Sequence, residues 1–418
     1  MRKDLELMME EIVTVACDSK ILLSKDAMGK FYLPIYGNSY WSTPNIDALA
    51  GKGTVFDCHY TTAPSTAMAM TSMFTGLYPY QTERKYYLPV GESEGYPSLL
   101  DKVASQGYEC HIVWDSSGKI DKRFTECFGE RTVWHWLEGI RQGVGAYRPH
   151  EGELVSNEAR VDDTVRIIRE CLSDIVSSGK RQFVWIHLPH VLNGRTGYGA
   201  DIDVFDRIVG EARTFFDDDE IYVTSDHGNM NGTRGKYCYG FDVYEPSICI
   251  PLVAPKVEGI DRCSFNTSNK DLLEIVFEGR IPRNEFVYSD SAYYAQPHRK
   301  LAIIHDEYRY IYNKKNGSEE LYDIDVDPSQ MRNLIDDFFY DADRNVDTSL
   351  AEMYFYPKWG RAKEMRELMR AEKNNIWREA TRAEKAHGKA EDSAKALYKK
   401  VRQIYRNATK GKEGSALR

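Results

Sequence analysis

The hydrophobic positions of this chain fall into two patterns, one spaced as in helices and one grouped as in buried strands. The helical pattern is clearest where apolar residues recur at alternating intervals of four and three: Val161, Val165, Ile168, Leu172 and Ile175. This spacing predicts an amphipathic helix over 159–176. Short apolar runs, which are typical of buried strands, occupy 11–18, 183–190, 220–228 and 248–255. Because predicted strands alternate with predicted helices, we expect an α/β fold with a mostly parallel central sheet flanked by helices.

The composition and the residue pattern of the chain change near residue 286 and again near residue 360. Between these points, stretches such as RKLAIIHDEYRYIYNKKNG combine strand-like runs with turn residues, which predicts short antiparallel strands. After residue 360 the chain is rich in Ala, Lys, Arg and Glu, which favours helix. We therefore expect three parts: a large α/β domain over 1–285, a C-terminal antiparallel α+β subdomain over 286–360, and a charged helical tail over 361–418.

Composition and charge narrow the class of protein. The chain has 418 residues, of which 42% are hydrophobic and 28% charged, so it can bury a large core. Its net charge of −9 argues against a nucleic-acid partner. The first residues, MRKDLELMMEE, lack the apolar centre of a signal peptide, and no segment is apolar enough to cross a bilayer. The eight cysteines form no C-x-x-C pair, so we expect reduced cysteines and a cytoplasmic location.

Polar side chains gather where three of the predicted strands end. They are, in chain order, Asp18, then His187 and His190, then Asp226 and His227. The carboxyl ends of parallel strands meet at one edge of the sheet, where α/β proteins bind their ligands. Aspartate and histidine side by side, as in SDHG at 225–228, are a common pair of metal ligands, although such a pair taken alone more often belongs to a hydrogen-bonded loop. Only the three clusters together favour a functional site.

The stretch TTAPSTAMAMTSMFTG, residues 61–76, leads from small hydroxyl-bearing residues into a Met-lined helix. Ser65 or Thr66 would lie at the start of this helix, where free backbone N–H groups favour an anionic substrate. A threonine hydroxyl is a poor nucleophile at neutral pH, but a divalent metal lowers its pKa. Taken alone, however, the stretch is explained more simply as a capped helix with its Met side chains in the core.

Several blocks of the sequence occur in the order of a known enzyme family: TPNIDALAGKGTVFDCHYTTAPST, TGLYP, LPH, YGADIDVFDRIVGEA, YVTSDHG, VYEPSICIPLVAP and ELYDIDVDP. Together they cover most of residues 11–335 and resemble the sulfatases and their relatives in the alkaline phosphatase superfamily. The resemblance implies that 1–285 is a sulfatase-like catalytic domain. It also implies that Thr66 is the nucleophile, because counting back from Thr75–Gly76 places Thr66 at the family's catalytic position.

The motif at this position departs from that of the sulfatases. They carry a Cys or Ser that is converted to formylglycine, followed by x-Pro-x-Arg, whereas AMAM follows Thr66 here. Threonine is not a substrate for that conversion, so ordinary sulfatase chemistry is not expected. The family's Lys-Trp-His block is also missing after Gly107–Tyr108, where VWDSSGK leaves Lys119 as the candidate substitute for a substrate-binding cation.

The remaining pattern is similar to the threonine-using branch, which includes phosphoglycerol and phosphoethanolamine transferases and resembles phosphonate monoester hydrolases. The resemblance implies one divalent metal with four ligands: Asp18, Thr66, Asp226 and His227. The pair Asp18–Ser19 would stand in place of the aspartate pair that usually follows the first strand. We expect Mn²⁺, while Zn²⁺, Mg²⁺ and Ca²⁺ stay open.

The resemblance also implies residues that contact the substrate. His190 takes the place of the family's substrate-side histidine and could protonate the leaving alkoxide. The same sequence pattern is also compatible with a buried, hydrogen-bonded histidine that has only a structural role. Lys236 lies a few residues from the usual lysine spacing, and we expect it to contact the phosphate together with Lys119.

We therefore predict a metal-dependent phosphoryl-group hydrolase or transferase that acts on a phosphodiester or phosphomonoester through a covalent phospho-threonine. The phosphate ester could be sugar-, nucleotide- or lipid-linked, and hydrolase and transferase share the same first half-reaction. Two alternatives stay open: an atypical sulfatase that uses unmodified threonine, and a non-catalytic binding protein that kept the fold. The C-terminal helices are explained most simply as a solvated tail, with self-association or attachment to an anionic surface as alternatives.

Overall fold

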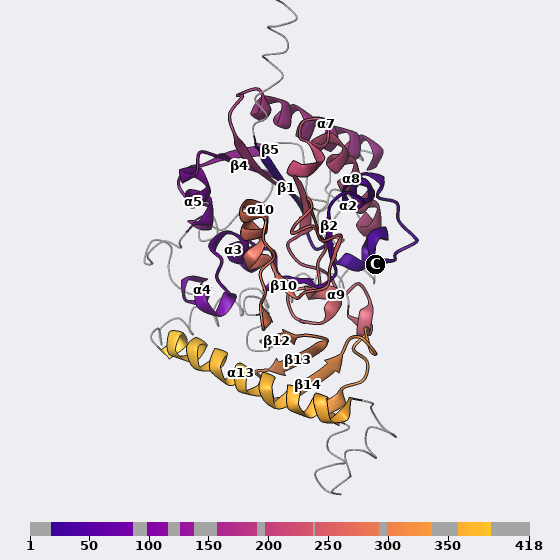
Figure 1. Cartoon of the computed structure of the whole chain (residues 1–418), viewed down its shortest axis with the longest axis vertical. Coiled ribbons are helices and arrows are strands. Elements are labelled where there is room, and N and C mark those ends of the chain that lie inside the picture. The colour runs from indigo at the N-terminus through magenta and orange to yellow at the C-terminus, as the bar shows by residue number, and fades with distance from the viewer. Residues whose placement is uncertain are drawn as a thin grey trace, which may run out of the picture.

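An eight-stranded, mainly parallel sheet lies at the centre of the structure (Figure 1). The computed structural model describes residues 18–86, 98–115, 126–137, 157–189, 197–236, 239–291, 299–336 and 358–385. The strands, in their order across the sheet, are β5 (Thr132–Leu137), β4 (Glu109–Asp115), β6 (Gln182–Leu188), β1 (Lys20–Lys25), β7 (Ile221–Ser225), β8 (Leu252–Ala254), β2 (Thr54–Phe56) and β9 (Arg262–Cys263). β1 pairs in parallel with β6 and β7, whereas β8 runs antiparallel to both of its neighbours. The predicted α/β fold is confirmed.

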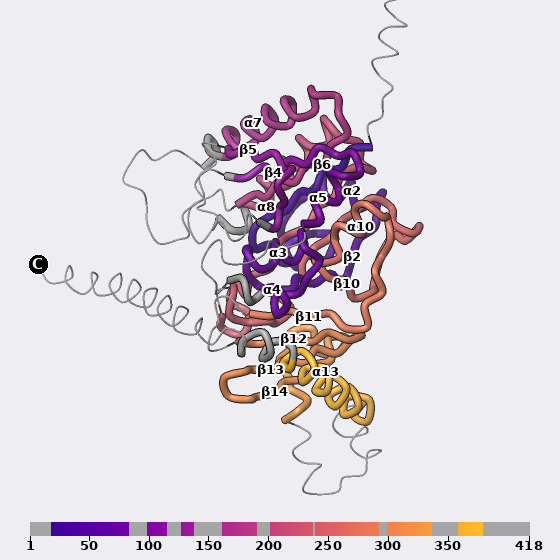
Figure 2. The backbone as a smooth tube through the Cα atoms, turned by 90° about the vertical axis from the view of Figure 1, so that its left-hand side faces the viewer, coloured from indigo at the N-terminus to yellow at the C-terminus, as the bar shows by residue number. Residues whose placement is uncertain are grey.

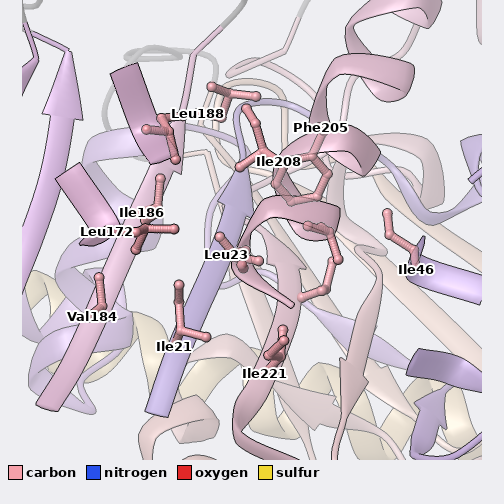
Figure 3. Packing of buried hydrophobic residues seen from close by; sticks show 14 of the residues in the cluster. Ile21, Leu23, Ile46, Leu172, Val184, Ile186, Leu188, Phe205, Ile208 and Ile221 are labelled. Atoms are coloured by element: carbon pink, nitrogen blue, oxygen red, sulfur yellow. The ribbon is translucent and has the colours of Figure 1, made fainter. Parts of the chain in front are cut away.

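Helices cover both faces of this sheet. Side chains alternate along a strand, so Ile21 and Leu23 of β1 point to one face and Leu22 points to the other. The first face is covered by α2 (Pro44–Ala50), α7 (Asn157–Val176) and α8 (Gly197–Ala212), whose apolar residues pack around β1 (Figure 3). The second face is covered by α3 (Thr66–Thr75), α5 (Leu99–Ser105) and α10 (Leu272–Glu278). The amphipathic helix predicted over 159–176 corresponds to α7.

A second, antiparallel sheet lies at one end of the molecule (Figure 2). It consists of β11 (Val287–Asp290), β12 (Lys300–His305), β13 (Tyr308–Asn313) and β14 (Glu319–Asp323). The long helix α13 (Trp359–Lys385) packs along one face of it, so the start of the predicted tail is part of this unit. The opposite face of the small sheet packs against residues of the large domain, among them Tyr60, Met230 and Tyr244. The small sheet therefore supports the loop that follows β7.

Shorter elements connect these layers. They are β3 (His59–Tyr60), β10 (Thr267–Ser268), α4 (Pro79–Tyr86), α9 (Glu245–Ile248) and the 3-10 turns at Lys30–Tyr32, Pro34–Tyr36, Glu126–Phe128, Asp218–Glu220, Thr233–Gly235 and Asn269–Asp271. Within the described ranges, none of the helices has both the length and the apolar character needed to span a membrane.

The first described strand begins later in the chain than the apolar pattern predicts. β1 is KILLSK at 20–25, and its central residues are buried between β6 and β7. Of the predicted run over 11–18, only Asp18 belongs to the described part of the chain. The carboxyl end of the strand therefore lies at Lys25, and Asp26 is the first residue beyond it.

Candidate functional site

Three side chains meet at the carboxyl ends of the two central strands. β1 and β7 are paired so that Lys25 lies opposite Ser225, which brings the residues that follow each strand to the same edge of the sheet. Asp26 follows β1, and Asp226 and His227 follow β7. One ligand atom from each of these three residues lies within 4.8 Å of the others. The structure thus has a carboxylate–carboxylate–imidazole cluster where strand-end chemistry was expected.

Thr66 lies beside this cluster at the start of α3. Ser65 has extended backbone angles, φ −155° and ψ 136°, and Thr66 is the first helical residue. The Ser65 side chain makes no capping hydrogen bond, so the interpretation of this segment as a hydroxyl-capped helix lacks its central contact. The Thr66 hydroxyl is 3.1 Å from Nε2 of His227, and Thr66 is only partly buried. Its hydroxyl is therefore placed beside the cluster rather than in the core, where Met68 and Met73 lie.

The hydrogen bonds of His227 determine which of its ring nitrogens carries the proton. Nδ1 lies 2.8 Å from the carbonyl oxygen of Gly228, which can only accept, so Nδ1 donates. Nε2 therefore presents a lone pair to the Thr66 hydroxyl. The carboxylate oxygens also approach Nε2, at 3.4 Å for Asp226 and 3.7 Å for Asp26. Three groups of acceptor atoms thus converge on one point.

Such a convergence is electrostatically unfavourable without a cation. Asp226 and His227 are fully buried, and Oδ2 of Asp226 has no hydrogen-bond partner within the described ranges. Oδ1 of the same carboxylate accepts from the backbone N–H groups of Ala27 at 2.9 Å and His227 at 2.7 Å, which fixes its orientation. A buried, unpartnered carboxylate oxygen beside a bare imidazole nitrogen fits a divalent metal, which takes both types of ligand. The donor set at this site therefore suits the metal that the sequence predicts.

A close backbone approach holds the cluster in place. A Cβ atom at Gly228 would lie 2.0 Å from the carbonyl oxygen of Pro246, and the Gly228 N–H donates to the carbonyl of Ser247 at 2.9 Å. Only glycine allows this contact between the loop after β7 and α9. The ring of Tyr239 also lies against His227, 4.6 Å away from centroid to centroid. The imidazole is thus held by a backbone hydrogen bond and by a ring contact.

The prediction that Asp18 is a metal ligand is wrong. Asp18 precedes β1, at the opposite end of the strand from Asp26, and its side chain is 60% exposed. It forms ion pairs with Lys20, at 3.3 Å, and with Arg181. Desolvation alone would raise the pKa of the Asp18 carboxyl, but these two cations bring it below its usual value. Asp26 takes the place that the sequence assigned to Asp18, because the strand ends eight residues later.

The predicted substrate contacts are only partly within the described structure. Lys236 donates to the carboxylate of Asp242 at 2.7 Å, a carboxylate that also pairs with Lys300, so its ammonium is part of an ion-pair cluster. Its proposed contact with substrate stays a prediction. Lys119 and His190 lie outside the described residues, although β6, which leads to His190, ends at the same edge of the sheet as β1.

Asp26 and Gly228 were not identified from the sequence as site residues. Asp26 follows SK, two polar residues that hide the end of an apolar strand. The signal that could have found Asp26 is the match of KILLSK to a buried strand with an aspartate directly after it. Gly228 is the last residue of the SDHG motif, but its close contact with the backbone of α9 involves residues further along the chain, which the motif alone does not reveal.

The chain is similar to known proteins in sequence and in fold. Residues 21–221 match the sequence profile of the Sulfatase family. The uncharacterized sulfatase YidJ of Escherichia coli K12 is 21% identical over 400 residues, which cover 72% of this chain and 80% of that protein. An N-acetylgalactosamine-6-O-sulfatase of Bacteroides thetaiotaomicron is 32% identical over 98 residues, which cover 22% of this chain and 19% of that protein.

Solved structures show the same fold. A 2-O GAG sulfatase superposes with a TM-score of 0.61 at 13% identity, covering 86% of this chain and 92% of the other. The phosphonate monoester hydrolase of Agrobacterium radiobacter superposes with a TM-score of 0.58 at 16% identity, covering 78% of this chain and 93% of the hydrolase chain. Residues 21–221, which include Asp26 and Thr66, thus resemble the Sulfatase family in sequence, and the chain shares its fold with these solved structures.

Proposed function

We propose that this protein is a metal-dependent hydrolase or transferase of phosphate esters, with Thr66 as the nucleophile. The observation that carries the proposal is the Thr66 hydroxyl 3.1 Å from Nε2 of His227, beside two carboxylates. The hydroxyl is at the start of a ten-residue helix, whose N–H groups and dipole favour a negatively charged ester. Two of the proteins named above, an N-acetylgalactosamine-6-O-sulfatase and a phosphonate monoester hydrolase, are named as ester hydrolases, which supports an enzyme rather than a binding protein.

Asp26, Asp226 and His227 would hold the metal, with Thr66 next to it, and the sequence favours Mn²⁺. A bound divalent ion would supply positive charge that stabilises the transferred group's oxygens and lowers the pKa of a neighbouring hydroxyl. The chain itself supplies the orientation: the Asp226 carboxylate is fixed by two backbone N–H groups, and the His227 ring by the Gly228 carbonyl. This preorganisation lets the hydroxyl approach the phosphorus without rearrangement.

In the first step, the Thr66 oxygen forms a bond to phosphorus while the bond from phosphorus to the ester oxygen breaks. The Thr66 hydroxyl gives its proton to a solvent water molecule, and the leaving alkoxide takes up a proton, for which His190 is our candidate donor. In the second step, the oxygen of water or of an acceptor hydroxyl forms a bond to phosphorus while the bond from phosphorus to the Thr66 oxygen breaks, and the proton of the incoming hydroxyl balances the one that Thr66 regains. The two outcomes are hydrolysis and transfer, and they differ only in this second step.

The choice of phosphorus over sulfur depends on the motif around Thr66. The chain carries neither the Cys or Ser precursor of formylglycine nor the Pro and Arg that accompany it. Among the similar folds is a phosphonate monoester hydrolase as well as sulfatases. Sulfate-ester hydrolysis is the second candidate, because the named relatives of similar sequence are sulfatases.

The test compares Thr66→Ala with Ser65→Ala on four substrates: p-nitrophenyl phosphate, bis-p-nitrophenyl phosphate, p-nitrophenyl phenylphosphonate and p-nitrophenyl sulfate. We expect the wild-type protein with Mn²⁺ to turn over at least one phosphorus ester, Ser65→Ala to keep most of this activity, and Thr66→Ala to lose it. Mass spectrometry of the quenched reaction should find the added phosphoryl group on Thr66. Full activity in Thr66→Ala would contradict the nucleophile, and turnover of the sulfate alone would favour the second candidate.

A metal analysis separates the enzyme from a binding protein. We expect one equivalent of divalent metal in the purified protein, or one equivalent taken up on titration with Mn²⁺. A protein that neither contains nor takes up a stoichiometric metal would favour the non-catalytic alternative.

A further inference from the structure

A buried lysine and a buried aspartate lie directly behind the ligand cluster. Lys25 is the last residue of β1 and its side chain is 2% exposed, while Asp201, early in α8, is 1% exposed. The Lys25 ammonium lies 3.6 Å from the Asp201 carboxylate, 3.3 Å from the carbonyl oxygen of Pro189 and 3.4 Å from that of Asp26. One charged group thus contacts three segments that meet at this edge of the sheet.

The direction of the Lys25 side chain separates it from the ester site. Side chains alternate along β1, so Lys25 points to the same face as Ile21 and Leu23, which is the face covered by α8. Thr66 belongs to α3, on the opposite face. The ammonium therefore contacts the backbone that carries the ligand Asp26 and the backbone that leads to His190, and it does not lie beside the nucleophile.

The two strand ends that Lys25 contacts are also joined directly. The backbone N–H of Asp26 donates to the carbonyl of Leu188 at 2.9 Å, which continues the pairing of β1 and β6 by one residue. Lys25 then contacts the carbonyl oxygen on the other side of Asp26 and the carbonyl oxygen that follows Leu188. The main chain of Asp26 is thereby held at both its N–H and its carbonyl.

Stability alone does not account for a charge pair at this position. Burying an ammonium and a carboxylate costs desolvation energy, and replacing both by apolar side chains of similar volume is often neutral or stabilising. A directional contact to the backbone of a metal ligand is what an apolar pair cannot provide. We propose that Lys25 and Asp201 are positioning residues that hold the end of β1, and with it the Asp26 carboxylate, in the geometry that binds the metal. This inference rests on the proposed function, because it takes the cluster to be a metal site.

The test uses the full-length protein and the metal alone, so that it does not depend on knowing the substrate. Mn²⁺ binding is measured by calorimetric titration and folding by thermal melting without metal, for Lys25→Met, Asp201→Leu and the double variant. Each single variant leaves one buried charge without this partner and should melt at a lower temperature than the wild type. The double variant should recover most of this loss and still bind Mn²⁺ about 10- to 100-fold more weakly, which is typical when a residue that supports a metal ligand is removed.

A matched control lies at the other end of the same strand. Lys20 and Asp18 form an ion pair at 3.3 Å there, away from the ligand cluster. The double variant Lys20→Met/Asp18→Leu should keep the wild-type affinity for Mn²⁺. An equal loss in this control would overturn the inference, because the effect would not depend on the position behind Asp26.

The deciding result is the Mn²⁺ affinity of the Lys25→Met/Asp201→Leu variant. Wild-type affinity in this variant would overturn the positioning role and leave the proposed function standing. Absence of Mn²⁺ binding in the wild-type protein would instead overturn the metal site itself, and the inference with it. If the double variant does not fold, Asp201→Asn, which keeps the shape and removes the charge, takes its place, with an expected loss of about 10-fold. An unchanged affinity there would again overturn the inference.

Discussion

Replacing Asp226 by asparagine removes the charge of this side chain but keeps its shape. Oδ1 of Asp226 accepts hydrogen bonds from the N–H groups of Ala27 and His227, so the amide oxygen of asparagine would take its place. The amide nitrogen would then replace Oδ2, which lies 3.4 Å from the bare Nε2 of His227. The substitution therefore converts a repulsion between two acceptors into a donor–acceptor contact.

The structure sets the expected size of this effect. An unsatisfied buried polar group costs about 1–3 kcal/mol, which the asparagine amide would relieve. Without divalent metal, the Asp226→Asn variant should thus be more stable to unfolding than the wild type by about 1–3 kcal/mol. With Mn²⁺ at about 1,000 times its Kd, the wild type should gain about 4.1 kcal/mol, whereas a variant that has lost a ligand should gain almost nothing. The order of stability should therefore reverse when the metal is added.

Urea unfolding in EDTA and in MnCl₂, followed by circular dichroism, measures both states. Asp18→Asn is the matched control, because Asp18 is the ligand that the sequence predicts, whereas the structure places it at the opposite end of β1. Its response to Mn²⁺ should equal that of the wild type. The reasoning is refuted if Asp226→Asn is the less stable protein in EDTA, or if it keeps the full gain in Mn²⁺.

Two further predictions concern the surroundings of the site. Gly228→Ala would place a Cβ atom 2.0 Å from the Pro246 carbonyl oxygen, so the free energy of unfolding in urea should fall by about 1–3 kcal/mol and Mn²⁺ should bind more weakly. Gly51→Ala is the control, because its Cβ atom would lie 3.5 Å from the nearest atom, and it should be neutral or stabilise the protein by about 0.4–1 kcal/mol. Equal effects of the two substitutions would contradict the argument. Burial lowers the pKa of His59 from 6.5 to about 3, so the native state binds this proton less readily than the unfolded state does. The difference in proton binding contributes to the stability of the folded protein. This contribution is complete above about pH 6.5, and it decreases by about 1.4 kcal/mol for each pH unit below that value. The free energy of unfolding of the His59→Gln variant should therefore fall less steeply between pH 6 and 4.5 than that of the wild type, by about this amount per pH unit. An unchanged dependence on pH would show that His59 is not buried in its neutral form.

The sequence predicted the type of most elements but not their arrangement in space. α7 was evident because its apolar residues repeat with the helical period, and the strand β7 because an apolar run ends abruptly in SDHG. The pairing of β1 with β6 and β7 could not be read in this way. The two partner strands, β6 and β7, lie about 160 and 200 residues further along the chain than β1, and no local pattern specifies such pairing.

The error at Asp18 has a physical cause in the end of β1. The strand finishes in Ser24 and Lys25, residues that normally indicate a solvated segment. Ser24 is buried because it bonds to Trp185 and His187 on β6, and Lys25 because it meets Asp201 on α8. Their partners are distant in sequence, so the run EIVTVACD looked more like a buried strand than KILLSK did. Asp226 and His227 were selected because they directly follow a clear apolar run, whereas Thr66 was selected through the family resemblance, by counting back from Thr75–Gly76.

The central position of β1 has a consequence for how the protein is made. The ribosome completes β1 first among the described strands, but β7 follows about 200 residues later, which is roughly 10 to 40 s at usual rates of synthesis. Until β6 emerges about 160 residues after β1, the apolar segment ILL has neither of its parallel partners and can pair with other chains. The nascent protein should therefore depend on chaperones until β7 has emerged, and the cluster of Asp26, Asp226 and His227 should be among the last features of the large domain to form.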